Sequence, residues 1–158
     1  MMTAVKQLMT PDPITIDPEA PVATAVAVMR ERGVRHLPVT DERRHVIGIL
    51  TDGDVRNALL APAFTEYLSA AAARRLRGAG DSLEKLRVRD VMTWDAMSIG
   101  PEAPVAQAAA LMVGARIGSL PVLEDGMLVG IITKTDALKA LAATLPSVRG
   151  LDPDTYLW

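Results

Sequence analysis

The chain has 158 residues, of which 49% are apolar and 3% aromatic, and its 17 basic and 19 acidic residues give a formal charge of −2. The length is enough for a buried core, and the absence of cysteine excludes disulfides, thiolate metal sites and a cysteine nucleophile. The balanced charge argues against a polyanion-binding surface, and the longest charge-free apolar stretch, 103–115, is too short to cross a membrane, so we expect a cytoplasmic protein.

An internal duplication organises the chain. Residues 5–41 align with 88–124 at 17 identities in 37 positions, and after a one-residue deletion 46–59 align with 128–141 at 6 in 14. The identities include Pro, Glu, Gly, Thr and Asp, so an Ala- and Val-rich composition does not explain them. The predicted division is repeat one at 5–61, a helical insert at 62–87, repeat two at 88–143 and a tail at 144–158.

Each repeat predicts the elements β-α-β-β-α. Strands are expected at 14–16, 36–39 and 46–51 and at 97–99, 119–122 and 128–133, and closing helices at 54–61 and 135–143. The first helix of each repeat has apolar residues at helical spacing after Pro21 or Pro104, and each proline suits the first helical position. This mixed order indicates an α+β fold with two packed repeats rather than a doubly wound sheet.

The insert and the tail have no counterpart in the duplication. Residues 62–87 are rich in Ala, Leu and Arg and predict one helix. The arginines within 74–77 could contact nucleic acid, but nearby acidic residues favour a solvated helix face, so nucleic acid is not an expected partner. The aromatic end at 156–158 is expected to pack on its own domain or on a partner subunit, with a docking tail as the alternative.

One motif occurs at the same place in both repeats, as GILTDGD at 48–54 and GIITKTD at 130–136. A threonine followed three residues later by an aspartate at a helix start forms a capping box, which gives the motif a purely structural interpretation. The glycine lets another group approach the strand, and the helix N-terminus attracts phosphate. Threonine for phosphate and aspartate for a ribose diol therefore also fit a nucleotide site.

The element order, the (H/S)LPV strand and the Gly-apolar-apolar-Thr-x-x-Asp motif resemble the cystathionine-β-synthase (CBS) domain. The resemblance covers 5–61 and 88–143 and implies two domains that pack through their sheets as a pseudo-two-fold pair, often called a Bateman module. The long insert and the lack of a fused domain are similar to stand-alone bacterial CBS pairs, including acetoin-utilisation-type accessory proteins.

The resemblance also implies two adenosine-ligand sites in the cleft between the domains. Thr51 and Asp54 would hold phosphate and ribose in one site, and Thr133 and Asp136 would do so in the other. The strands and backbone expected to flank adenine contain Thr15, Ile16, Pro38, Ser98, Ile99 and Pro121.

The phosphate end of the two sites is expected to differ. Family members often place a basic residue or histidine before the second strand, and Arg35 and His36 fit that role beside the repeat-one motif, although His36 fits a core histidine equally well. Repeat two has Ser119 there, with Arg116 and Lys134 as the nearest cations. We therefore expect unequal sites.

These features predict a regulatory module that binds AMP, ADP or ATP, with S-adenosylmethionine, NAD(H) or cyclic di-AMP as alternatives. No cofactor or resident metal is expected, and Mg²⁺ would enter only with ATP. No nucleophile–base pair or phosphate-binding GxxxxGK[ST] loop is present, so an enzyme is not expected. We expect a homodimer through the apolar helix faces and an unidentified regulated partner. The alternative is a ligand-free protein-interaction scaffold.

Overall fold

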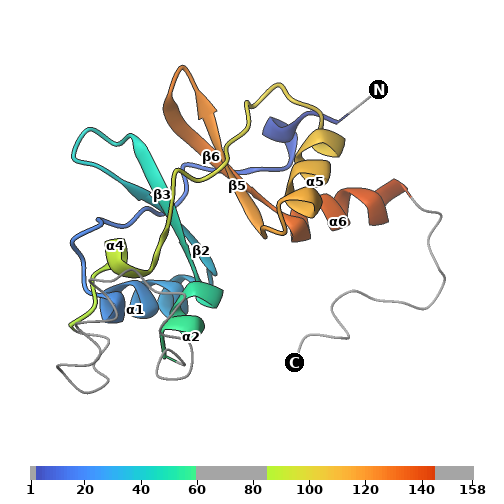
Figure 1. The fold of residues 1–158 in the computed structure, drawn as a ribbon. Helices are drawn as coiled ribbons and strands as arrows, with labels where there is room; N and C mark the ends of the chain where they lie inside the picture. The colour runs from blue at the N-terminus through green and yellow to red at the C-terminus, as the bar shows by residue number, and fades with distance from the viewer. Residues whose placement is uncertain (1–2, 60–84, 145–158) are drawn as a thin grey trace.

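The computed structural model describes residues 3–59 and 85–144, and it has two halves, each with one antiparallel hairpin and two longer helices (Figure 1). The first half contains α1 (Val22–Arg32), β2 (His36–Thr40), β3 (Val46–Thr51) and α2 (Asp52–Leu59). The second contains α5 (Val105–Gly114), β5 (Ser119–Glu124), β6 (Met127–Thr133) and α6 (Lys134–Thr144). The predicted α+β class is confirmed.

The helix and tail predictions for the two unmatched segments fall mainly on residues 60–84 and 145–158, which lie outside the described residues. Within the described ranges, the longest helices have 11 residues, and none is long and apolar enough to cross a membrane.

The start of each repeat packs in the other half, which the sequence did not predict. The N-terminal helix η1 (Val5–Gln7) and strand β1 (Thr10–Pro11) lie beside the second half, where β1 pairs with β6 (Figure 1). Helix α4 (Val88–Val91) and strand β4 (Thr93–Trp94) lie in the first half, where β4 pairs with β3. The two three-stranded sheets therefore have the orders β1-β6-β5 and β2-β3-β4.

Buried side chains anchor this exchange. Val5 is fully buried in the core of the second half, while Val88 and Met92 are buried in the core of the first half. Removing such side chains from water stabilises each half by about 1.5–3 kcal/mol per residue. The sequence repeats and the structural halves therefore do not coincide, because each half needs a segment from the other repeat to complete its core.

The repeated strand glycines make room for the exchanged segments. A Cβ atom on Gly48 would clash with the backbone carbonyl oxygen of Thr93, and one on Gly130 would clash with Sδ of Met9. We expected these glycines to let another group approach the strand closely. The groups that approach are the protein's own exchanged segments.

Two local predictions also change. Pro21 and Pro104 are helix N-caps with extended ψ angles of 143° and 140°, so each helix begins one residue later than expected. The first helical N–H groups, of Val22 and Val105, donate to Leu86 and Thr3 of the exchanged segments at 2.9 Å. The extended proline conformation brings the chain to these partners.

The predicted first strands at 14–16 and 97–99 are reduced to single parallel bridges, Ile16 to Val39 and Ile99 to Val122. The regular strands lie earlier, and each is followed by an aspartate in the left-handed region, Asp12 (φ 44°) or Asp95 (φ 48°). This conformation turns the chain out of the ladder, which ends the strand.

Candidate functional site

Both Thr-x-x-Asp motifs form complete capping boxes. Thr51 donates from N and Oγ1 to Asp54 Oδ2 at 2.8 and 2.7 Å, and Asp54 N donates to Thr51 Oγ1 at 3.2 Å. Thr133 and Asp136 repeat these bonds at 2.8, 2.7 and 3.3 Å. The single hydroxyl proton of each threonine is already donated to the carboxylate. The groups left for a ligand are the second carboxylate oxygen and the helix N–H groups.

Each motif faces a cleft whose other wall comes from the opposite half. The Thr51 cleft, of about 470 Å³, joins Thr51 and Asp54 to residues 115–119, which lead into β5, and to residues 95–97. The Thr133 cleft, of about 310 Å³, joins Thr133 and Thr135 to residues 33–36, which lead into β2, and to residues 12–14. Both volumes are within the range of small-molecule sites.

The cation pairing expected from the sequence is therefore reversed. Arg35 and His36 line the Thr133 cleft, although His36 lies opposite Thr51 in the β2–β3 ladder. Arg116 and Ser119 line the Thr51 cleft. The reason is that the two halves face each other crosswise, so the end of β3 in one half lies near the start of β5 in the other.

The residues expected to flank adenine do not line these two clefts. Ile16, Ile99, Pro38 and Pro121 are buried, and Thr15 and Ser98 are absent from both linings. The residues of these segments that do line the clefts include Ile14 and Met97, which stand two positions before Ile16 and Ile99. Because an extended chain alternates its side chains, this spacing of two marks the same side of the segment. The matched Asp12 and Asp95 were also missed, and their recurrence in both repeats was the available signal.

Two further predicted residues lie elsewhere. Asp136 is held in its capping box and does not line the Thr133 cleft. Lys134 lines a separate apolar groove between α5 and α6. The aspartate of the Thr-x-x-Asp motif therefore lines a cleft only in the first repeat, as Asp54, and this is the main chemical difference between the two motifs.

The arginines of the two clefts also differ in their partners. Arg35 Nε lies 3.1 Å from Asp52 Oδ2, which also receives Arg56 Nη1 at 2.7 Å. Burial of Asp52 opposes ionisation, but the hydrogen bonds from Arg56 and Arg35 hold the pKa of this carboxyl below its usual value. Arg116 makes no ion pair within residues 3–59 and 85–144. Its charge is therefore available to an anion in the Thr51 cleft.

His36 lies between the halves, beside Gly118, where a Cβ atom would approach its Nε2 to 2.9 Å. Burial lowers the pKa of His36, an effect that Asp52 partly opposes and Arg35 reinforces. The imidazole makes no hydrogen bond to any part of the chain that the structure describes.

The described residues contain no group of three acidic or histidine side chains arranged for a metal ion. Asp52 and Asp54, separated by Gly53 in the motif, make different contacts: Asp52 binds two arginines and Asp54 caps α2.

Comparison with known proteins supports the fold and its repeats. The CBS domain family model matches residues 5–61 and 88–143. A CBS domain-containing protein of Dictyostelium discoideum is 34% identical over 152 residues, covering 94% of this chain and 97% of that protein. An inosine-5'-monophosphate dehydrogenase of Korarchaeum cryptofilum is 35% identical over 126 residues, or 79% of this chain, which corresponds to about a fifth (21%) of the dehydrogenase.

Two solved structures with bound ligands are similar. CBSX2 in complex with AMP has a TM-score of 0.68 and 26% identity, covering 89% of this chain and 96% of that one. The CBS domain pair of protein MJ0100, in complex with 5'-methylthioadenosine and S-adenosyl-L-methionine, has a TM-score of 0.74 and 23% identity, covering 92% and 100%. With two matched copies, a common fold and a relative similar over nearly its whole length, this chain belongs to the CBS domain family as a tandem CBS pair.

Proposed function

We propose that this protein is a non-catalytic regulatory module that binds an adenosine nucleotide in the Thr51 cleft. One observation carries the proposal: this cleft brings Asp54, the start of α2 and Arg116, which has no ion pair among the described residues, together against an apolar wall that includes Met97. The AMP complex of the similar CBSX2 supports the ligand class.

Each part of a nucleotide has a complementary group there. The second oxygen of Asp54 can accept hydrogen bonds from a ribose diol, while Oδ2 keeps the capping bonds. Arg116 and the first N–H groups of α2 suit a phosphate. Ile49, Met97 and Ile117 provide apolar surface for adenine. AMP is the first choice because the cleft offers one arginine and one helix start; ADP, ATP and S-adenosylmethionine are the next ligands to compare.

The cleft has walls from both halves, so a ligand in it contacts both. Its binding changes their relative arrangement only by as much as its affinity differs between the two arrangements. A partner that contacts both halves could detect that change. The partner and a homodimer stay predictions from the sequence.

The test is calorimetry with AMP on two matched variants, Asp54→Asn and Asp136→Asn. Each substitution weakens the capping box of its own repeat, and the two boxes have matching geometry. The losses in the free energy of unfolding should therefore be similar, about 1 kcal/mol each. Only Asp54→Asn removes a carboxylate that lines a cleft, and it should weaken AMP binding about 10-fold or more, since a hydrogen bond to a charged group contributes about 1.5–3 kcal/mol. Asp136→Asn should change the affinity by less than about 2-fold.

Three other results would contradict parts of this proposal. Loss of AMP affinity in Asp136→Asn alone would assign the ligand to the Thr133 cleft. If the unmodified protein binds neither AMP, ADP, ATP nor S-adenosylmethionine at millimolar concentration, the regulatory proposal fails and the scaffold alternative takes its place. Release of phosphate or AMP from ATP would contradict the non-catalytic part.

A further inference from the structure

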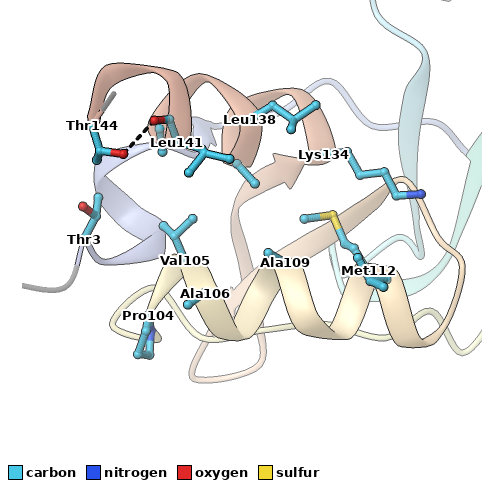
Figure 2. A pocket seen from close by; sticks show the side chains of 13 residues that line it. Thr3, Pro104, Val105, Ala106, Ala109, Met112, Lys134, Leu138, Leu141 and Thr144 are labelled. Carbon is cyan, nitrogen blue, oxygen red and sulfur yellow. Dashed lines mark hydrogen bonds between the residues drawn. The ribbon is translucent and has the colours of Figure 1, made fainter. Parts of the chain in front are cut away.

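The lining of the Thr51 cleft has an excess of negative charge. Two carboxylates line it, those of Asp54 and Asp95, and Arg116 is the one cation among its described lining residues. Lys134, which the sequence predicted as a site cation, lines the apolar groove between α5 and α6 instead (Figure 2). Asp54 is assigned above to the ribose and to the cap of α2. Asp95 is therefore the charged group of this cleft that the proposed function leaves unexplained.

The backbone at residue 95 explains a short polar side chain but not its charge. Asp95 follows β4 with a left-handed backbone (φ 48°), and its N–H donates to the carbonyl oxygen of Ile47 at 3.1 Å. Asparagine also adopts this conformation, and glycine adopts it freely. The carboxylate of Asp95 makes no hydrogen bond or ion pair in the part of the chain that the structure describes. The turn therefore does not require the negative charge, which lies at the wall of the cleft.

The matched residue of the other repeat, Asp12, has a different electrostatic environment. Arg44 Nη2 lies 3.6 Å from Asp12 Oδ1, and Arg35 lines the same cleft as Asp12. The hairpin turn of the second half that corresponds to the Arg44 turn is Glu-Asp-Gly at 124–126, which contains no cation. The two repeats therefore share the aspartate but not the arginine beside it, and the charge of Asp95 is the less compensated of the two.

A phosphate chain on the ligand would bring further negative charge toward this wall. Charged groups across a cleft of about 470 Å³ are roughly 10 Å apart, and at that separation in water one pair of unit charges changes an equilibrium constant about 2-fold. The value for water applies because Asp95 is exposed. We propose that Asp95 is a specificity-determining residue that limits the negative charge of the ligand, so that the Thr51 cleft selects an adenosine compound with at most one phosphate over a nucleoside triphosphate. This inference rests on the function proposed above, because it concerns the same cleft.

The test compares Asp95→Asn with the matched variant Asp12→Asn in the full-length chain. Each substitution removes one charge and keeps a side chain that tolerates the left-handed backbone, and Asp12 lines the Thr133 cleft rather than the Thr51 cleft. Calorimetry measures the dissociation constants of adenosine, AMP and ATP at about 0.01 M ionic strength, where the Debye length is about 30 Å. A chelator removes Mg²⁺, so that ATP keeps its full negative charge.

The unmodified protein should bind AMP more tightly than ATP. With about two negative charges on AMP and about four on ATP, Asp95→Asn should tighten AMP binding about 2- to 4-fold and ATP binding about 8- to 16-fold. Adenosine, which is uncharged, should bind as before. Asp12→Asn should tighten ATP binding by less than about 3-fold, because its charge is more distant and lies beside Arg44. In 1 M salt, where the Debye length is about 3 Å, the unmodified chain and Asp95→Asn should bind ATP equally.

Tighter binding of ATP than of AMP by the unmodified chain overturns the inference, and so does a preference for AMP that Asp95→Asn leaves unchanged. Asp95→Gly repeats the test with a residue that suits a positive φ, so a folding defect in the asparagine variant does not decide the outcome. If Asp54→Asn weakens AMP binding while neither variant of Asp95 alters the preference, the proposed function stands and this inference alone fails. If none of the three ligands binds at millimolar concentration, both fail.

Discussion

Residues 33 and 116 occupy the same place in the two repeats and have the same left-handed backbone, with φ angles of 64° and 56°. In the first half the residue is glycine, which adopts this conformation freely. In the second half it is arginine, whose Cβ atom makes the conformation unfavourable by about 1–2 kcal/mol. The unfavourable arginine lines the Thr51 cleft, whereas the glycine lines the Thr133 cleft.

The comparison extends to the rest of the two halves. The two halves match in their capping boxes, in their left-handed aspartates and in their strand glycines. The aspartates follow the exchanged strands, and the glycines contact the exchanged segments. Several differences lie at exposed or cleft-lining positions, such as Ser119 in place of His36 and Val113 in place of Arg30. Shared residues therefore build much of the pair, and unshared residues give the two clefts and the two helix faces different side chains.

The largest expected effect tests how the two matched strand glycines, Gly48 and Gly130, differ in what they contact. Gly48→Ala should lower the free energy of unfolding by about 1–3 kcal/mol, because its Cβ atom meets the backbone oxygen of Thr93 in the β3–β4 pair. Gly130→Ala should cost about 1 kcal/mol or less, because the clash is with the flexible side chain of Met9. Urea unfolding of both variants measures the difference.

Equal losses of unfolding free energy in the two variants would mean that the two exchanged segments adjust equally to the added methyl group. The packing of β4 on β3 would then be no tighter than that of β1 on β6. A larger loss in Gly130→Ala would reverse the comparison.

The second prediction separates stability from binding. Arg116→Gly should weaken AMP binding about 10-fold, since it removes a charge-assisted contact. It should leave the free energy of unfolding unchanged or slightly higher, because glycine relieves the left-handed strain. Calorimetry and urea unfolding on one preparation give both quantities.

Arg44→Gly is the control for this substitution. Arg44 also has a positive φ, 66°, and its ion pair at 3.6 Å is with Asp12, outside the Thr51 cleft. It should relieve similar strain without changing AMP affinity. Equal affinity losses in the two variants would show that general surface charge, rather than the position of Arg116, attracts the nucleotide.

The duplication and the local patterns were sufficient to predict the hairpins, the helices that follow them and both capping boxes, because these depend on residues close in sequence. The exchange of Val5 and Val88 between halves could not be predicted this way: an alignment of repeats shows equivalence and carries no information on which copy packs with which. The crosswise pairing of Arg116 with Thr51 was missed for the same reason.

The smallest expected effect concerns His36, whose pKa burial lowers, with Asp52 and Asp54 acting against that shift and Arg35 with it. A histidine with a folded pKa below its unfolded value of about 6.5 binds protons more readily in the unfolded chain. Its contribution to stability is therefore complete above pH 6.5 and falls as the pH drops toward the folded pKa. His36→Gln should reduce the loss of stability between pH 7.5 and 5.5, as measured by urea unfolding.

The same histidine can distinguish the two clefts by NMR titration of its imidazole Cε1–H signal, assigned by its disappearance in His36→Gln. Without ligand the midpoint should lie below 6.5, and a midpoint at or above 6.5 contradicts the effect of burial. His36 lines the Thr133 cleft, so a phosphate bound there should raise its pKa strongly, whereas AMP in the Thr51 cleft, which is lined by Asp54 and Gly118, should raise it less. A rise as large as that expected for a phosphate directly beside the imidazole would mean that the Thr133 cleft also binds the nucleotide.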